Sequence, residues 1–156
     1  YEVRAVDSSE AAINELRRRV RREALPVEAI CEDISDFPVA PGTYDAVVAV
    51  TVLCHLEPER IPETARRIVR GLRPDGLLLA EEFTPDDPGA RGEAPSSEFA
   101  HLVEKYFSPG ELKRLFPSLQ PVCCRVLRVV DDTHGEEHRH SLIRYVGRKL
   151  PMRNEE

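Results

Sequence analysis

The chain has 156 residues, of which 41% are hydrophobic, and it carries a formal net charge of −6. This length and apolar content predict one globular domain over residues 1–150, followed by a polar tail over 151–156. The basic residues are scattered along segments that also carry glutamate, which argues against a nucleic-acid surface. No apolar run reaches the roughly 20 residues needed to cross a bilayer, and no signal-peptide pattern opens the chain. We therefore expect a cytoplasmic protein whose partners are small molecules, with neither nucleic acid nor membrane among them.

Four cysteines are spread through the chain without the paired spacing of a metal site. We interpret most of them as reduced, buried packing residues rather than as a disulfide framework or a redox pair. They are Cys31, Cys54, Cys123 and Cys124.

The first elements read as strand, helix, strand. Val3–Val6 is predicted to be a strand, and Ser8 or Ser9 can cap the helix that follows. Pro26 ends that helix, and the alternating segment "VEAIC" predicts a second short strand. The helix is predicted from apolar residues at spacings of three and four, namely Ile13, Leu16, Val20 and Ala24.

The central part of the chain predicts a buried parallel sheet. Tyr44–Val50 is continuously apolar, which is typical of a strand covered on both faces at the centre of such a sheet. Its carboxyl end is where a ligand is expected. A helical stripe runs from Pro58 to Leu72, a turn is predicted at "RPDG", and "LLLAEEF" predicts another buried strand.

The last third begins with a segment that has no periodicity. Thr84–Ser97 is rich in Pro, Gly, Asp and Ser and predicts a long exposed loop, either a lid or a disordered segment. "SPGE" at Ser108 to Glu111 is a capping-box pattern that opens a short helix. The segments "VCCRVLRVV" and "SLIRYVGRK" are joined by a short connection and can pair only antiparallel.

Four stretches in this order resemble one family: "VRAVDSS", "CEDISDFP", "YDAVVAVTVLCHL" and "LRPDGLLLAEEF". They resemble the class I S-adenosylmethionine-dependent methyltransferases, and most closely the small bacterial enzymes of the tellurite-resistance and ubiquinone-biosynthesis type. The resemblance implies an α/β fold, with a Rossmann-like sheet that ends in an antiparallel hairpin. It covers nearly the whole chain.

The same resemblance implies S-adenosylmethionine as the cofactor. It places Asp7, at the end of the second strand of the family, at the ribose hydroxyls, which an acidic side chain can accept. Asp33 and Ile34 match the positions that read the adenine. The alternatives are that Asp7 caps the next helix and that Asp33 is an ordinary loop acid. Including the chain beneath the methionine part, the predicted cofactor residues are Asp7, Ser8, Asp33, Ile34, Thr51 and Val52.

One part of the family's pattern is missing. The glycine-rich motif and its strand, which hold the methionine tail of the cofactor, would fall immediately before Tyr1, and Tyr1 is not an initiator Met. Without that strand the sheet has two unpaired edges. We favour the interpretation that the domain is N-terminally incomplete, a fragment of a longer polypeptide. Pairing with a strand from a second chain, or a non-binding relative of the family, are the alternatives.

Few residues are candidates for the chemistry of methyl transfer, which depends mainly on aligning the reactants. His55, just past the central strand, is the candidate general base for a hydroxyl or amine acceptor. Its alternative is a packing or helix-entry residue. Candidates for the acceptor pocket are Glu81, Glu82, Phe83 and Tyr106, with ordinary rim residues as the alternative.

Three histidines lie close together in the predicted hairpin turn, which raises the possibility of a metal site. They are His134, His138 and His140, with Glu136 and Glu137 beside them. No second pair of ligands is evident in the sequence, so we interpret them as a polar loop near the substrate mouth and predict no metal.

The sequence therefore favours transfer of a methyl group from S-adenosylmethionine to a small molecule by in-line displacement. A non-catalytic binding domain without the glycine-rich motif is one alternative. A nicotinamide-dependent oxidoreductase is another, disfavoured by the hairpin at the end of the sheet. The acceptor and the oligomeric state cannot be read from the residues.

Overall fold

The computed structural model describes residues 1–92, 102–132 and 137–151. It divides into two compact units, residues 1–38 and residues 39–156, which are treated separately below. None of its helices is long and apolar enough to pass through a membrane, among the residues described.

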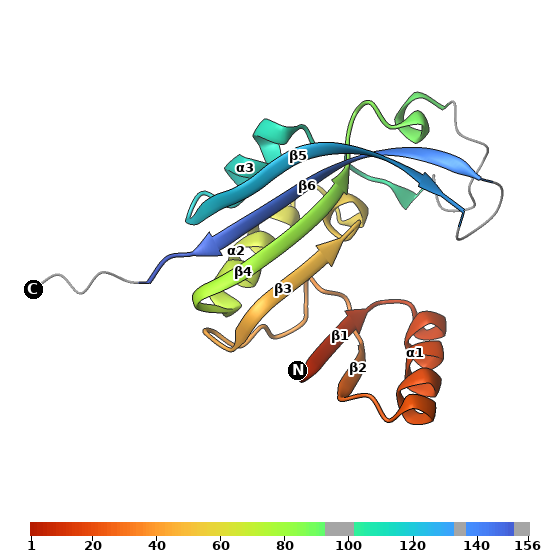
Figure 1. Cartoon of the computed structure of the whole chain (residues 1–156), viewed down its shortest axis with the longest axis vertical. Coiled ribbons are helices and arrows are strands. Elements are labelled where there is room, and N and C mark those ends of the chain that lie inside the picture. The colour runs from red at the N-terminus through yellow and green to blue at the C-terminus, as the bar shows by residue number, and fades with distance from the viewer. Residues whose placement is uncertain (93–101, 133–136, 152–156) are drawn as a thin grey trace, which may run out of the picture. The chain divides into compact units, whose positions relative to one another are not determined.

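The first unit is a strand, a helix and a second strand (Figure 1). β1 (Val3–Asp7) pairs in parallel with β2 (Val27–Cys31), and α1 (Glu10–Glu23) forms the crossover. Ser9 caps α1 by accepting a hydrogen bond from the Ala12 N–H, which confirms one of the two predicted caps. A single buried side chain of α1, Ile13, anchors its apolar stripe.

The second unit contains a mixed sheet of four strands in the order β3-β4-β6-β5 (Figure 1). β3 and β4 are parallel, whereas β6 is antiparallel to both β4 and β5, so the predicted C-terminal hairpin is confirmed. The strands are β3 (Tyr44–Val50), β4 (Leu72–Phe83), β5 (Leu119–Asp131) and β6 (His138–Lys149). The helices are η1 (Leu53–His55), α2 (Ile61–Gly71), η2 (Pro88–Arg91) and α3 (Pro109–Leu115).

The core of the second unit lies between one face of its sheet and the helices α2 and α3. Side chains that alternate along β4 and β6 point into it, and both Leu78 and Tyr145 are fully buried. α2 contributes Ile61, Ala65 and Ile68 to the core, and α3 contributes Leu112. α3 begins at the predicted capping box: the Ser108 and Glu111 side chains each accept a hydrogen bond from the other's backbone N–H, at 3.3 and 2.9 Å.

β3 differs from its prediction as a central strand covered on both faces. Among the described residues β3 is an edge strand of its sheet, where it pairs with β4 alone. Val48 is 68% exposed and Val50 46% exposed, whereas Ala49 between them is buried. The prediction was wrong because a continuous apolar segment indicates that a strand is able to be buried on both faces. It does not indicate how many strands or helices lie beside that strand.

Three smaller predictions also need correction. The "RPDG" turn lies inside β4, where the register jumps from Leu72 to Leu77 and Asp75 has a φ of 62°. In the predicted loop from Thr84 to Ser97, residues 93–97 lie outside the described part of the chain. The described part is not simply an exposed loop, because Thr84 and Asp87 are buried and form hydrogen bonds with β6. All four cysteines are free, but only Cys54 is buried, since the others lie on strand ends and faces that keep solvent contact.

Candidate active site

Asp7 and Asp33 follow two neighbouring parallel strands, as the sequence predicts. Asp7 ends β1 opposite Cys31, the last residue of β2, and its carbonyl accepts a hydrogen bond from the Glu32 N–H at 3.1 Å. Asp33 lies two residues beyond Cys31. The two acids therefore stand at the same edge of the small sheet, where parallel α/β sheets bind ligands.

Each of these acids also holds its own turn. The Asp7 Oδ1 accepts a hydrogen bond from the Ser9 N–H at 2.7 Å, and the Asp33 Oδ1 accepts one from the Ser35 N–H at 2.7 Å. Such contacts two residues on are typical of Asx turns. A carboxylate has two oxygens and about four lone-pair sites, so these local bonds leave acceptor capacity on both side chains.

The end of β3 has an unusual backbone. Thr51 has a φ of 49°, in the left-handed region that a β-branched residue rarely adopts. Its N–H donates to the Glu81 carbonyl at 2.7 Å, which fixes it beside the end of β4. Strain of this kind persists only where surrounding contacts impose it, and it is common where a chain bends around a ligand. Val52 follows and leads into η1.

Glu82, a candidate for the acceptor pocket from the sequence, has a role that the sequence analysis did not predict. It is fully buried, and its two carboxylate oxygens accept hydrogen bonds from the Leu53 and Cys54 N–H groups, both at 3.0 Å. Burial raises the pKa of Glu82 to about 7, against the lowering effect of those two N–H donors. Burial and the nearby Glu82 charge likewise raise the pKa of the Cys54 thiol, so this cysteine is not a nucleophile. The sequence did carry a signal, because Glu82 continues the buried alternation of Leu78 and Ala80.

His55, the candidate base, lies at the end of η1 and is exposed. Its Nδ1 is 2.8 Å from the Leu102 carbonyl oxygen, which can only accept, so Nδ1 carries the proton in the neutral ring. The Nε2 lone pair is then the one available to take a proton.

The candidates for the acceptor pocket gather near this end of the sheet. Glu81 is buried beside the Arg144 guanidinium, with which it forms an ion pair, so its carboxylate is already engaged. Phe83 accepts a backbone hydrogen bond from the Phe107 N–H at 2.8 Å, which brings the segment carrying Tyr106 to the end of β4. Burial and the charge of Asp87 raise the pKa of the Tyr106 hydroxyl, which keeps it a neutral donor.

The structure therefore brings Thr51, Glu81 and the segment before α3 together in the second unit, and Asp7 with Asp33 in the first. A recess of about 570 Å³ between α2 and α3 is a separate feature, since none of the predicted site residues lines it. Its walls include Pro58, Arg66, Lys105 and Phe107.

Comparison with known proteins finds similarity to methyltransferases. A family model described as "Methyltransferase domain" matches residues 1–76. Among curated proteins, mouse N-terminal Xaa-Pro-Lys N-methyltransferase 1 is 36% identical over 52 residues, covering 33% of this chain and 23% of the relative. Hemagglutinin 1 of Eikenella corrodens is 34% identical over 90 residues, covering 56% of this chain and 30% of the relative. The chain thus spans less than half the length of the curated relatives it matches.

Solved structures show the same fold over nearly the whole chain. TehB from Haemophilus influenzae aligns with a TM-score of 0.74 at 20% identity, over 96% of this chain and 50% of TehB. A SAM-dependent methyltransferase from Methanosarcina mazei aligns with a TM-score of 0.76 at 18% identity, over 97% of this chain and 84% of that chain. These findings confirm the predicted fold, that of the class I S-adenosylmethionine-dependent methyltransferases.

Proposed function

We propose that this chain transfers the methyl group of S-adenosylmethionine to a small-molecule acceptor. The observation that carries the proposal is the pair of acids, Asp7 and Asp33, at the ends of the adjacent parallel strands β1 and β2. Two acids at successive strand ends suit a ligand with a ribose at one end and a base at the other.

The residues present fit that cofactor. Asp7 would accept the ribose hydroxyls with the oxygen that does not hold Ser9, and Ser8 lies beside it on the same turn. Asp33 would accept the adenine amino group, with the Ile34 N–H beside it for a ring nitrogen. Thr51 and Val52 would pass beneath the methionine part. Bound there, S-adenosylmethionine supplies a methyl group activated by its positive sulfur.

The acceptor side is assigned to the second unit. His55 would take a proton from a hydroxyl or amine acceptor through Nε2, because Nδ1 is committed to the Leu102 carbonyl. Phe83 and Tyr106 would line the pocket. Glu81 would position the Arg144 guanidinium through their ion pair, and would not contact an acceptor directly.

A small-molecule acceptor is favoured over a protein or tRNA. The solved 1,6-didemethyltoxoflavin-N1-methyltransferase of Burkholderia thailandensis, whose structure contains that small substrate, aligns over 97% of this chain with a TM-score of 0.68. The matches to N-terminal Xaa-Pro-Lys N-methyltransferases cover between 33% and 59% of it. A cytoplasmic location and the lack of a nucleic-acid partner are further parts of the proposal.

The test is calorimetric titration of S-adenosylhomocysteine into the protein as its gene encodes it, and into residues 1–156 alone. We expect Asp7→Asn to weaken binding about 10- to 100-fold, because hydrogen bonds to a charged group contribute about 1.5–3 kcal/mol. Asp45→Asn is the matched control, since Asp45 is an exposed acid that pairs with Arg73 on the surface.

Equal affinities for the two variants would contradict the assignment of Asp7. No binding to either form of the unaltered protein would overturn the enzyme and leave a non-catalytic domain. If binding is found, transfer of a radiolabelled methyl group to small-molecule pools and to denatured protein separates the two acceptor classes.

A further inference from the structure

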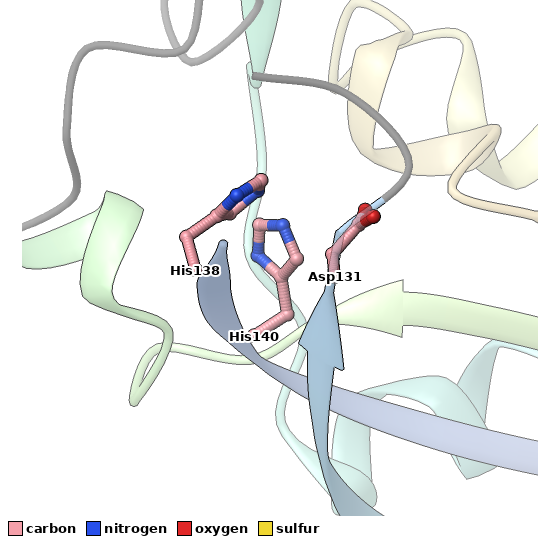
Figure 2. Close-up of side chains that lie close together, drawn as sticks. All are labelled: Asp131, His138 and His140. Atoms are coloured by element: carbon pink, nitrogen blue, oxygen red, sulfur yellow. The ribbon is translucent and has the colours of Figure 1, made fainter. Parts of the chain in front are cut away.

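Three side chains that can bind a metal lie close together where β5 ends and β6 begins, next to the connection of the β5–β6 hairpin (Figure 2). Asp131, the last residue of β5, is directly opposite His138, the first residue of β6. His140 lies two residues further along β6, so its side chain is on the same face of the sheet. None of the three belongs to the proposed cofactor site.

The three groups are close enough to share one ion. A ligand atom from each residue lies within 4.8 Å of the others, and all three residues are half-buried. Tetrahedral ligands at about 2.0–2.1 Å from zinc are about 3.3 Å apart. Rotations about the side-chain bonds can close the difference, because the three side chains lie close together (Figure 2).

His140 is held in the orientation of a metal ligand. Its Nδ1 lies 3.1 Å from the Asp87 Oδ2, and the same oxygen accepts the Ser141 N–H at 2.8 Å. Asp87 is itself fixed, because its side chain is only 3% exposed and its Oδ1 accepts the Gly89 N–H at 2.8 Å. The Phe83 ring packs against the imidazole with centroids 5.0 Å apart.

A carboxylate on one ring nitrogen fixes the tautomer and leaves the lone pair of the other nitrogen for a metal. Proteins use this carboxylate–histidine arrangement widely behind zinc ligands. Asp87 therefore leaves Nε2 of His140 as the atom that can bind a metal. Figure 2 shows the imidazoles of His138 and His140 and the Asp131 carboxylate close together.

We propose that Asp131, His138 and His140 form a binding site for a divalent transition metal, with zinc as the best-suited ion. Two imidazoles and one carboxylate are ligands that zinc prefers, whereas calcium and magnesium need more oxygen ligands. Three protein ligands leave one position of a tetrahedral ion open to water or another molecule. The sequence analysis found no partner for the histidines because Asp131 is brought to them only by the antiparallel register.

The site is tested with tag-free protein and zinc chloride in a calorimetric titration. We expect one equivalent to bind, and His138→Ala and His140→Ala each to abolish that binding. Asp87→Asn keeps all three ligands and should weaken binding about 10- to 100-fold, as loss of a carboxylate behind a ligating histidine does. Zinc should also raise the midpoint of thermal unfolding in the unaltered protein but not in the histidine variants.

The matched control is His55→Ala, which removes one imidazole outside the cluster and should bind zinc like the unaltered protein. Cobalt(II) distinguishes the ligands, since a site without cysteine gives no thiolate-to-metal absorption. Unchanged affinity in both cluster variants, or thiolate absorption in the cobalt form, would overturn the site. Circular dichroism checks that each variant folds, and Asp131→Asn, at the half-exposed end of β5, provides a third ligand variant if either histidine variant does not.

Discussion

The turns after β1 and β2 and the loop after β3 occupy equivalent places at strand ends, but different forces hold them. Asp7 and Asp33 each bond a backbone N–H only two residues away. The loop after β3 is held instead by Glu82, which reaches the Leu53 and Cys54 N–H groups from 29 and 28 residues away. Two of these turns are therefore local structures, and the third exists only because β4 lies beside β3.

This difference bears on the proposed chemistry. A locally held acid keeps its geometry even if distant parts of the fold change, which suits Asp7 and Asp33 as fixed contacts for a ligand. The loop after β3 carries His55 on η1, so its position depends on a buried carboxylate. Glu82 is thus a positioning residue for the candidate base. The predictions below test this contrast, beginning with the largest expected effect.

Glu82→Ala should destabilise the protein far more than Asp33→Ala. The first change leaves two buried N–H donors without an acceptor and opens a cavity, at a cost of about 3–5 kcal/mol. The second removes the local hydrogen bond to the Ser35 N–H, and the loss of such a bond costs about 1 kcal/mol. Free energies of unfolding in urea measure both. Equal costs would show that the two turns are held alike.

Stability should depend on pH through Glu82, with a sign opposite to that of most acids. Burial raises the pKa of Glu82 in the folded protein to about 7 from an ordinary value of 4.5. Between these values the unfolded chain ionises while the folded protein keeps its proton, so stability falls as pH rises, by about 3 kcal/mol at most. Urea unfolding at pH 5, 6, 7 and 8 checks this against Glu82→Gln. A slope that is the same in both proteins would contradict it.

Glu111 provides the local counterpart. The Ser108 backbone and side chain, and then Lys105, lower the pKa of Glu111 to about 2. Its contribution is therefore present above pH 4.5 and is lost as pH falls toward 2, the reverse of Glu82. Ser108→Ala should cost about 1 kcal/mol near neutral pH, as loss of a helix N-cap does. Unfolding measured from pH 6 down to pH 3 should show a shallower acid loss in this variant.

The smallest effect is expected on the exposed face of β3. Val48→Thr should change stability by less than about 0.5 kcal/mol, because Val48 is 68% exposed. Leu78→Ala, on the neighbouring strand but fully buried, should cost about 2–5 kcal/mol. A cost above 1 kcal/mol for Val48→Thr would show that something covers this face of β3 in solution.

Much of the fold could be predicted because its signals are local. The cap of α1 at Ser9, the capping box at Ser108 and the strand "VEAIC" all depend on residues a few positions apart. The candidate acids Asp7 and Asp33 were found for the same reason, since each directly follows a strand. Their assignment to the cofactor stays a prediction.

What could not be predicted depends on which strands lie side by side. β3 was expected to be covered on both faces, and only the strand order shows it at the end of its sheet. Glu82 was expected to line the acceptor pocket, and its role in holding the loop after β3 was not predicted because its partners, Leu53 and Cys54, are far away in the sequence. Asp87 was placed in an exposed loop, although it is buried against Ser141 and His140.

The sequence by itself determined the fold class, the succession of strands and helices along the chain, and the acids at or just after the ends of the first two strands, because hydrophobic period and turn chemistry act over short distances. The tertiary structure alone decided that a buried carboxylate holds the loop after β3. It also decided that Asp131 meets two histidines across the β5–β6 hairpin. The antiparallel register and the order of strands in the sheet bring these residues together, and no short segment of the sequence specifies either of them.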